Sequence, residues 1–531
     1  MGILKSIRSS SLTMITFILL SGCNDHEASL ARPNILFCLA DDASWKHFEA
    51  YGCKWVKTPG FDEIAARGLL FNNAYTPTAK CAPSRSAILT GRNPWQLEEA
   101  ANHICYFPKK FTTIAEALSS SGYHVGYTGK GWAPGNAGKI DGKKRDLIVE
   151  AYNERKLNPP TKEISNKDYA ANFKLFLEKK ETGQPFFFWY GGHEPHRRYE
   201  YKSGIEKGGA SPEMIEGVPE FWPDTDTVRT DMLDYAYEIQ YFDHQLEQIL
   251  EILKTAGELE NTLIVVTADN GMPFPRAKGH NYEYSNHLPL AIMWESGINK
   301  PGRVIDDYVT FIDFAATFAD VSGLDIDEQG MYPIEGESLD DIFKSKKSGQ
   351  VVPGRNKVIL GRERNDVGRP GDVGYPVRAI IKNGFLYIRN FKTDRWPAGN
   401  PETGYTDTDG SPTKSYILNL RRRGEDTYYW KLNFGKRPAE ELYDLNNDPD
   451  CTVNLADEPE YDTMQQELSD LLIEELTRQQ DPRILGNGDI FDSYPTTSIN
   501  NFYEKYMEGE EVHAGWINST DYEQDTAYWK E

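Results

Sequence analysis

The chain has few cysteines for its length: six in 531 residues, with no two spaced as CxxC. A zinc site built from paired cysteines is therefore not expected. Basic residues are also in deficit, because 58 Lys and Arg stand against 81 Asp and Glu, for a formal net charge of −23. This charge argues against nucleic acid as a partner. No G-x-S-x-G turn, phosphate-binding P-loop or dinucleotide fingerprint is present, so three common enzyme classes have no support.

The apolar run near the N-terminus is too short to span a bilayer. Residues 14–20 follow Lys5 and Arg8 and lead into Leu20-Ser21-Gly22-Cys23, the pattern of a bacterial lipoprotein signal. We expect a signal peptide over 1–22, lipid attachment at Cys23, and an exported periplasmic or cell-surface lipoprotein that meets the membrane only through its lipid anchor. A plain secretion signal, with Cys23 incidental, is the alternative.

The rest of the composition is that of a globular protein, with 39% hydrophobic and 12% aromatic residues. The length allows two domains. Lys, Ser, Gly and Pro cluster over 345–355 and indicate a boundary there. We expect a catalytic domain over 30–350, a C-terminal α+β subdomain over 351–480, and a tail over 481–531.

The order of predicted elements indicates an α/β fold. Strands are expected over 33–40, 123–127, 185–190, 262–268 and 289–294, and helices over 61–70, 111–120 and 230–253. Several of these strands are continuous apolar runs, as strands buried on both faces are. Strands alternating with helices predict a large, doubly wound, mainly parallel sheet, in which ligands collect at the carboxyl ends of the strands.

Two of the predicted strands end in groups suited to a metal. Asp41 and Asp42 follow the first strand, and two adjacent carboxylates repel each other unless a cation lies between them. Asp269 and Asn270 follow the strand over 262–268 and offer oxygen ligands of the kind that calcium prefers. The alternative for Asp41 and Asp42 is a pair of solvated turn residues.

The stretch Lys80-Cys81-Ala82-Pro83-Ser84-Arg85, followed by Leu89-Thr90-Gly91, resembles the type I sulfatases. In that family a maturing enzyme oxidises the cysteine to Cα-formylglycine, whose hydrate supplies the nucleophile. An arginine one helical turn beyond Cys81 suits a group that holds the hydrate and a sulfate oxygen. The plain alternative is that Cys81 is one more buried thiol.

The resemblance implies an alkaline-phosphatase-like fold and a set of site residues. Calcium would be held by Asp41, Asp42, Cys81 as formylglycine, Asp269 and Asn270. The catalytic group would be Cys81, Arg85, Lys130 and His196, the last as the acid that protonates the leaving oxygen. Lys278 and His193 would contact the substrate.

One position departs from the family pattern. The family has Gly-Lys-x-His where this chain has Gly129-Lys130-Gly131-Trp132. In the family this histidine takes a proton from the hydrate during sulfate release, so the resemblance implies another base, for which His103, His124 and His280 are candidates, or a different arrangement.

The sugar contacts are predicted from loops and from the C-terminal part. Trp95 and His103 lie in a predicted loop and are candidates for sugar contact. The family places a small antiparallel sheet after the catalytic domain, and an apolar stripe over 464–476 predicts a closing helix. Arginines there, Arg378 above all, with Arg362 and Arg364, are candidates to read a uronate.

The cysteines outside these motifs allow one further prediction. With Cys23 and Cys81 assigned, four remain. In an oxidising compartment Cys53 and Cys105 are one candidate disulfide pair, by parity alone.

These features predict a sulfatase that removes sulfate esters from a sulfated polysaccharide, either an algal polymer such as ulvan or a glycosaminoglycan, and that needs a sulfatase-maturing enzyme. Two alternatives are open. The first is an activity like that of the heparan N-sulfatases, which the motifs Asp269-Asn270-Gly271 and Pro273-Phe274-Pro275 and the stretch His193 to Arg197 resemble. The second is a non-catalytic, glycan-binding surface lipoprotein, which Trp132 favours.

Overall fold

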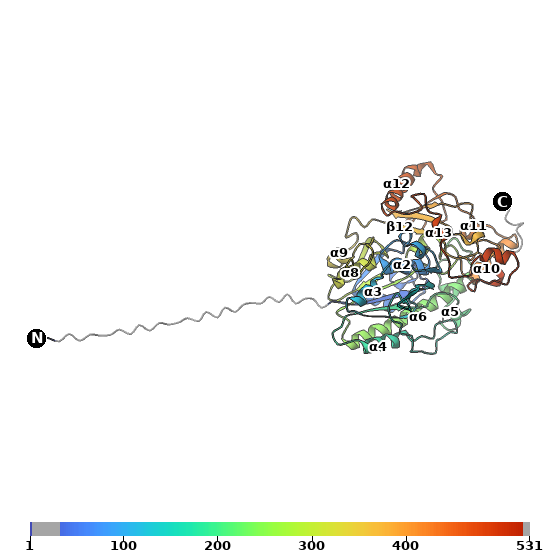
Figure 1. The fold of residues 1–531 in the computed structure, drawn as a ribbon. Helices are drawn as coiled ribbons and strands as arrows, with labels where there is room; N and C mark the ends of the chain where they lie inside the picture. Colours follow the sequence, from blue (N-terminus) through green and yellow to red (C-terminus); the bar gives the residue numbers. More distant parts are fainter. Residues whose placement is uncertain (3–31, 524–531) are drawn as a thin grey trace. The chain divides into compact units, whose positions relative to one another are not determined.

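The structure is a computed structural model that describes residues 1–2 and 32–523 (Figure 1). The expected signal peptide and the lipid attachment at Cys23 lie outside the described residues. Within 32–523, no helix is both long enough and apolar enough to cross a bilayer. The expected domain boundary near residue 350 stays a prediction.

A seven-stranded sheet forms the centre, in the order β11-β2-β10-β9-β1-β8-β4. Six strands run parallel, and β10 alone is antiparallel to its two neighbours. The strands are β1 (Asn34–Ala40), β2 (Leu69–Tyr75), β4 (His124–Gly129), β8 (Phe186–Gly191), β9 (Thr262–Ala268), β10 (Ala291–Met293) and β11 (Arg303–Thr310). The predicted parallel α/β sheet is confirmed.

The register of the central strands brings their carboxyl ends to one level. Ala40 of β1 pairs with Ala268 of β9, and Leu39 pairs with Gly191 of β8. These three strands are buried at every position, which the continuous apolar runs indicate. The loops that follow β1, β8 and β9 therefore leave the sheet side by side.

Helices cover both faces of this sheet (Figure 1). One group comprises α6 (Asp226–Ala256), with α1 (Pro59–Arg67) and α4 (Tyr169–Lys179) packed against it. The other comprises α2 (Cys81–Thr90), α3 (Ile114–Ser120) and α8 (Asp313–Ser322), which contact one another. Thr225 caps α6 by accepting a hydrogen bond from Val228, and Gly257 ends it with φ of +70°.

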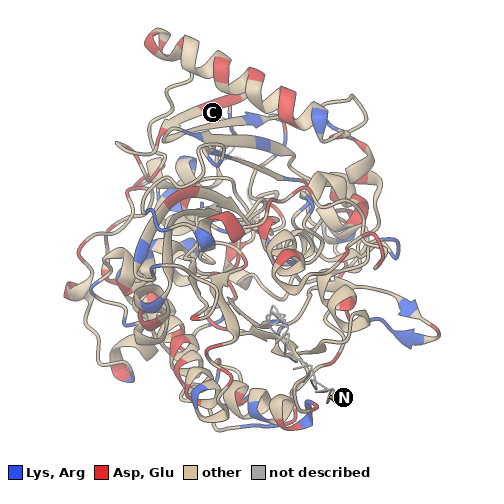
Figure 2. Ribbon diagram, turned by 90° about the vertical axis from the view of Figure 1, so that its left-hand side faces the viewer, with Lys and Arg blue, Asp and Glu red and all other residues tan. Residues whose placement is uncertain are grey.

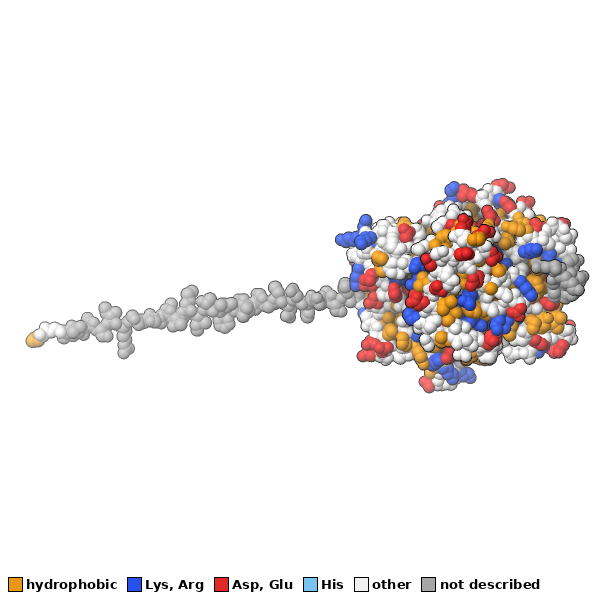
Figure 3. Space-filling view, turned by 90° about the horizontal axis from the view of Figure 1, so that it is seen from above, with side chains coloured by type: hydrophobic (Ala, Val, Ile, Leu, Met, Phe, Trp, Pro, Cys, Tyr) orange, Lys and Arg blue, Asp and Glu red, His pale blue; other side chains and the backbone are white. Residues whose placement is uncertain are grey.

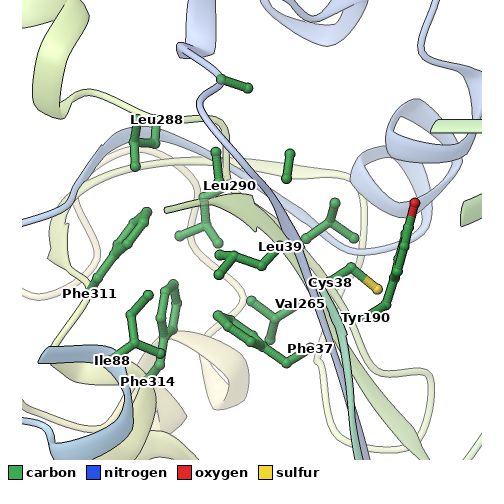
Figure 4. Close-up of a cluster of buried hydrophobic side chains, with 14 of the residues drawn as sticks. Phe37, Cys38, Leu39, Ile88, Tyr190, Val265, Leu288, Leu290, Phe311 and Phe314 are labelled. Atoms are coloured by element: carbon green, nitrogen blue, oxygen red, sulfur yellow. The ribbon is translucent and has the colours of Figure 1, made fainter. Parts of the chain in front are cut away.

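The core fixes α2 against the sheet (Figure 4). Phe37 of β1 meets the rings of Trp189 at 4.8 Å and Phe314 at 5.3 Å, both edge to face. Ile88 of α2 joins the same cluster, and all four side chains are fully buried or nearly so. Burying one such side chain stabilises the fold by about 1.5–3 kcal/mol. This packing holds the helix whose first residue is Cys81.

The second, smaller sheet is antiparallel and packs under a long helix. Its strands, in order, are β12 (Lys357–Arg362), β13 (Val377–Lys382), β14 (Phe385–Asn390) and β15 (Glu440–Asp444). Helix α12 (Asp462–Arg478) buries Leu468, Leu472 and Leu476 against it. The predicted small sheet and closing helix are both confirmed.

The five cysteines of the described region, Cys38, Cys53, Cys81, Cys105 and Cys451, are all buried free thiols. The suggested disulfide between Cys53 and Cys105 is therefore wrong. Both thiols pack in the main hydrophobic core, and burial raises the pKa of Cys105 to about 12.

The surface reflects the acidic composition. Acidic residues line the outer side of α12 at the top of Figure 2, while a small hairpin formed by β6 (Lys139–Ile140) and β7 (Lys143–Lys144) is basic. Figure 3 shows acidic and basic side chains intermixed over the face seen from above. This pattern is unlike the continuous basic stripe that nucleic acid requires.

Candidate active site

Cys81 is the first residue of α2 and lies beneath the end of β1. Its side chain is 1% exposed. Its Sγ lies 3.4 Å from Asp41 Oδ1 and 3.9 Å from Asp42 Oδ1. The loop between β2 and α2 thus carries residue 81 to the strand-end carboxylates, as the predicted site requires.

A compact group of candidate metal ligands surrounds Cys81. One ligand atom each from Asp41, Asp42, Cys81 and Asp269 lies within 4.8 Å of the others, and all four residues are buried. Asn270 Nδ2 donates to Asp42 Oδ1 at 2.7 Å. Asn270 Oδ1 is buried without a hydrogen-bond partner. A buried oxygen without a donor is costly, so this carbonyl and the carboxylates fit a divalent cation with oxygen ligands.

Arg85 joins the loops after three strands. Its Nε lies 2.8 Å from Asp269 Oδ2, and its Nη2 lies 3.6 Å from Asp41 Oδ1. Its Nη1 donates to the backbone carbonyls of Lys130 at 2.8 Å and Gly131 at 2.7 Å. The guanidinium is fully buried, so it is a fixed positive charge beside Cys81.

Two lysines contact the same carboxylates. Lys130 forms an ion pair with Asp41. It can do so because Gly191 lets β4 approach β8: a Cβ there would lie 1.9 Å from the Lys130 carbonyl oxygen. Lys278 Nζ lies 2.7 Å from Asp42 Oδ2 and 2.9 Å from Asp409 Oδ2.

The buried carboxylates of this cluster differ in acidity. Burial alone would raise the pKa of Asp41, but nearby cations, with Lys130 the strongest, outweigh it and hold the pKa well below its usual value. Burial, followed by the charge of Asp41, raises the pKa of Asp269 to about 6. Asp269 therefore takes up a proton more readily than a solvated aspartate, and a bound cation would favour its ionised form.

Two histidines after β8 line an open cavity beside the cluster. The cavity has a volume of about 470 Å³, and its walls include His193, His196, Lys130 and Asp41. His196 Nδ1 is 2.6 Å from the Arg197 carbonyl oxygen, to which it donates, and Nε2 is 3.8 Å from Asp42 Oδ2. Its Nε2 therefore lies on the side of the buried carboxylates beside Cys81.

His193 has a different environment. Its Nε2 is 3.0 Å from Lys167 Nζ, so it accepts a hydrogen bond from the ammonium. Burial, then the charge of Lys167, lowers the pKa of His193 to about 3. The imidazole is therefore neutral at physiological pH.

Three buried charged residues of the site were missed from the sequence. Asp409 contacts Lys278, and its carboxylate lies within 4.8 Å of the ligand atoms of Asp42 and His196. Lys80 Nζ lies 2.7 Å from Asp366 Oδ2. Asp366 and Asp409 belong to irregular segments between strands of the small sheet, and no periodic pattern or family motif marks them.

The structure does not bring the predicted uronate-reading arginines to the cavity. Arg378 is fully buried and bonds to Asp481 and Glu363. Arg362 and Arg364 donate to backbone carbonyls within the fold. A substrate therefore cannot reach these guanidinium groups, and the predicted sugar-binding role of Arg378 is wrong.

The two predicted loop contacts are also structural. Trp95 is 2% exposed and donates from its indole nitrogen to Gln479 Oε1 at 2.8 Å. His103 is 8% exposed, and its Nδ1 lies 2.9 Å from Asp366 Oδ1. His103 thus supports the Lys80–Asp366 pair, and neither residue lines the cavity that contains His193 and His196.

Trp132 is turned into the protein. Its indole nitrogen donates to Ser86 Oγ at 2.8 Å, and its ring packs on Phe107. The suggested substitutes for the family histidine lie elsewhere. His124, at the opposite end of β4, is 3.2 Å from the Phe176 carbonyl, and His280 borders a separate cavity by the small sheet. Within the described region, the histidines that border the cavity beside Lys130 and Asp41 are His193 and His196.

Comparison with known proteins agrees with this geometry. The model of the sulfatase family matches residues 33–324. Human N-sulphoglucosamine sulphohydrolase is 27% identical over 488 residues, covering 85% of this chain and 91% of the relative. An ulvan-active sulfatase from Formosa agariphila is 28% identical over 446 residues, covering 82% of this chain and 78% of the relative.

Solved structures share the fold. A protein bound to its substrate D-glucosamine-2-N,6-O-disulfate superposes with a TM-score of 0.57 at 20% identity, covering 85% of this chain and 98% of that one. Phosphonate monoester hydrolase of Agrobacterium radiobacter gives 0.58 at 17% identity, covering 85% and 97%. The family match spans more than half of the chain and contains the strand-end cluster around Cys81. This chain therefore belongs to the sulfatase family.

Proposed function

We propose that this sulfatase removes sulfate esters from a sulfated polysaccharide or its oligosaccharides, using formylglycine formed at Cys81 and a calcium ion. The observation that carries the proposal is the position of Cys81. Its sulfur lies within 4.8 Å of ligand atoms from three buried carboxylates, at the level where three strands end. A thiol kept only for packing would lie among apolar side chains.

The modified side chain would supply the nucleophile. Oxidation of Cys81 by a maturing enzyme gives an aldehyde, and its hydrate offers one hydroxyl to attack sulfur and a second to expel sulfate. Calcium held by Asp41, Asp42, Asp269 and Asn270 would offset negative charge on the sulfate oxygens. Arg85 orients residue 81 from the next helical turn.

The remaining groups act on the sulfate and on the leaving oxygen. Lys130 and Lys278 place their ammonium groups beside the carboxylates, where sulfate oxygens would lie during the reaction. His196 Nε2 faces the cavity next to Asp42. A protonated His196 would donate its proton to the departing sugar oxygen.

His193 lines the same cavity as Lys130. Its Nε2 accepts a hydrogen bond from Lys167, and with a pKa of about 3 the imidazole is a weak base. We therefore assign His193 a contact with the substrate, and not the role of the base that Trp132 replaces.

The cavity suits a sugar with a second negative charge. Its volume of about 470 Å³ falls in the range of small-molecule sites. Lys167 lines it and forms no ion pair with a carboxylate of the described chain; its ammonium donates to His193. This unpaired charge favours a substrate with a uronate or a second sulfate near the reacting one.

The relatives support two substrate classes. One acts on ulvan, and the other is an N-sulphoglucosamine sulphohydrolase, so sulfated glycans are common to both. Export as a lipoprotein through Cys23, with a periplasmic or cell-surface location, would place the enzyme where such polymers are degraded.

The decisive experiment replaces Cys81 with alanine and measures sulfate release from a panel of sulfated oligosaccharides. The panel includes ulvan fragments, O-sulfated glycosaminoglycan fragments and N-sulfoglucosamine. We expect the variant to lose turnover on every substrate while Cys105→Ala, a matched buried thiol outside the cluster, retains it. Mass spectrometry of the residue 81 peptide should show the mass lost when a thiol becomes an aldehyde.

Three results would each overturn part of the proposal. Sulfate release at the parental rate from Cys81→Ala would refute the formylglycine mechanism. Release from N-sulfoglucosamine alone would establish the N-sulfatase alternative instead. Glycan binding with no turnover in protein that contains the modified residue would establish the non-catalytic one.

A further inference from the structure

The segment that carries Lys278 continues against the small sheet and encloses a second, much smaller cavity. The Gly279 carbonyl accepts hydrogen bonds from Arg362 Nη1 and from Asn365 Nδ2, the latter at 2.9 Å. Beyond it, His280 and Asn281 face strands β12–β14 across a small cavity with a volume of about 10 Å³. That volume holds one water molecule or one single-atom ion.

Two guanidinium groups line this space, those of Arg362 and Arg437, and a third, that of Arg276, lies over the ring of Tyr282 at 4.0 Å. Arg362 Nη2 donates to the Pro397 carbonyl at 2.9 Å, and Arg437 Nη1 donates to the Lys431 carbonyl at 3.0 Å. Arg276 donates to the carbonyls of Leu432 and Cys451. Within residues 32–523 none of these three arginines forms an ion pair. Arg276 and Arg362 are 2% and 3% exposed, so water screens their charge poorly.

One carboxylate, that of Glu441, lies at the cavity, and its oxygens accept hydrogen bonds from neutral groups. Glu441 accepts from the hydroxyls of Tyr282 at 2.9 Å and Tyr443 at 2.6 Å, and from Asn390 Nδ2 at 2.8 Å. Its single charge offsets one of the three guanidinium charges. Burial, and then the charges of Arg362 and Arg437, hold the pKa of His280 well below its usual value. The guanidinium groups near His280, those of Arg276, Arg362, Arg369 and Arg437, outnumber the carboxylates Glu441 and Asp407, so the surroundings are positive.

Several buried polar atoms around this space lack a hydrogen-bond partner among the described residues. They are Nε of Arg276, Arg362 and Arg437, the hydroxyl of Tyr375, both side-chain polar atoms of Asn281, and Nε2 of His280. Most of these atoms are donors, and native proteins rarely leave so many buried donors unused. A group that accepts several hydrogen bonds at once would satisfy the donors among them, whereas Asn281 Oδ1 is an acceptor and gains no partner from such a group.

We propose that this cavity binds one chloride ion between the Gly279–Tyr282 segment and the small sheet. The excess of donors favours an anion over water, which must also donate its own two hydrogens. The volume favours a single-atom ion over sulfate or phosphate. The proposal concerns a site separate from the catalytic cluster and does not depend on the proposed reaction.

The ion would stabilise the loop that presents Lys278. His280 and Asn281 follow Lys278 by two and three residues. Arg362 donates to the carbonyl of Gly279, which lies between Lys278 and His280. An anion shared by these groups would tie the segment to β12. Chloride should therefore raise stability and, through Lys278, reduce KM for a sulfated substrate.

The test compares the full chain in sodium chloride, bromide, gluconate and sulfate at equal ionic strength. We expect a saturable rise in Tm with chloride and bromide, of about 2–3 °C at a hundred times Kd, and no rise with gluconate or sulfate beyond that of ionic strength. Crystals soaked in bromide should show one anomalous peak bounded by His280, Arg362 and Arg437.

Two variants separate binding from folding. Arg437→Gln removes a half-buried guanidinium and should abolish the chloride-dependent shift, whereas Arg423→Gln, at an exposed arginine paired with Glu425, should keep it. Tyr375→Phe removes one hydroxyl and should weaken the halide effect in a protein that still folds. Equal Tm in chloride and gluconate with no bromide peak, or equal protection by sulfate, would overturn the proposal.

Discussion

Replacing Arg378 by methionine separates a structural role from substrate recognition. Arg378 lies in β13 with 0% exposure. Its Nε is 2.7 Å from Asp481 Oδ2, and its Nη2 is 3.0 Å from Asp481 Oδ1 and 2.8 Å from Glu363 Oε1. Methionine would fill much of the same volume. It would leave Asp481 buried without its cation, whereas Glu363 would keep Arg483 at 2.7 Å.

The cost follows from that one uncompensated carboxylate. Removing one partner of a buried ion pair costs about 3–5 kcal/mol. The entropy of unfolding near 60 °C is about 2.1 cal/mol/K per residue, hence about 1 kcal/mol/K for a chain of this size. Arg378→Met should therefore lower Tm by about 3–5 °C. Because the side chain does not reach the catalytic cavity, KM should stay within about twofold of the parent's.

Calorimetry and steady-state kinetics on a uronate-containing oligosaccharide measure both quantities. Arg389→Met is the matched control, because Arg389 lies opposite Arg378 on β14 and is half-buried without an ion pair in the described chain. Its Tm should change little. An unchanged Tm for Arg378→Met together with a KM raised tenfold would refute the structural role.

Three further predictions concern the metal, the acid and the pH dependence. A chelator should lower both activity and Tm, and calcium at a hundred times its Kd should raise the free energy of unfolding by about 2.7 kcal/mol. Identical melting with and without the chelator would contradict a cation site at Asp269. His196→Ala should reduce turnover of sugar sulfates by about 10²–10⁴-fold but affect nitrophenyl sulfate far less, since that leaving group needs no proton; equal losses would contradict an acid role. Burial, then the charge of Lys46, lowers the pKa of His47 to about 3, below the unfolded value near 6.5. The contribution of neutral His47 to the free energy of unfolding is thus complete above pH 6.5. It is lost as the pH falls toward 3, and the loss reaches about 2–3 kcal/mol by pH 4.5. In urea denaturation at pH 7 and 4.5, His47→Phe should remove that loss, and exposed His244→Phe should not.

The central strands could be predicted from the sequence because they are buried on both faces. Runs such as 185–190 contain only apolar and aromatic side chains, and the strands β8, β9 and β1 follow them closely. Strands β2 and β11 were not predicted. Both alternate between buried and partly exposed positions, and Asn72, Asn73, Asp306 and Asp307 interrupt their apolar pattern. The predicted helix over 61–70 therefore extended past α1 into β2.

The grouping of Asp41, Asp42, Cys81 and Asp269 could be predicted because these residues follow strands or begin a helix. Parallel strands bring their carboxyl ends together, so Asp42 and Asn270 form a hydrogen bond although 228 positions separate them. Asp41 and Asp269, which precede them, become neighbours for the same reason. The positions of Asp409 and Asp366 could not be predicted in this way, because both residues reach the site from irregular segments. The error at Arg378 has a related cause. A strand arginine is usually solvated, and nothing in the sequence shows that Asp481 covers it.

The charges of the site imply that metal and sulfate bind cooperatively. The three ligand carboxylates and Asp409 face Arg85, Lys130 and Lys278, so four buried acids oppose three cations. Without a metal, both lysines are occupied by carboxylates, and the site has no excess positive charge for a dianion. A divalent cation reverses the balance and releases the ammonium groups toward sulfate. By linkage, sulfate must then tighten calcium binding by the factor by which calcium tightens sulfate. Titration calorimetry of calcium into the modified enzyme, with and without saturating inorganic sulfate, measures this factor, which should exceed about fivefold; an unchanged calcium Kd would show that the lysines are not shared in this way.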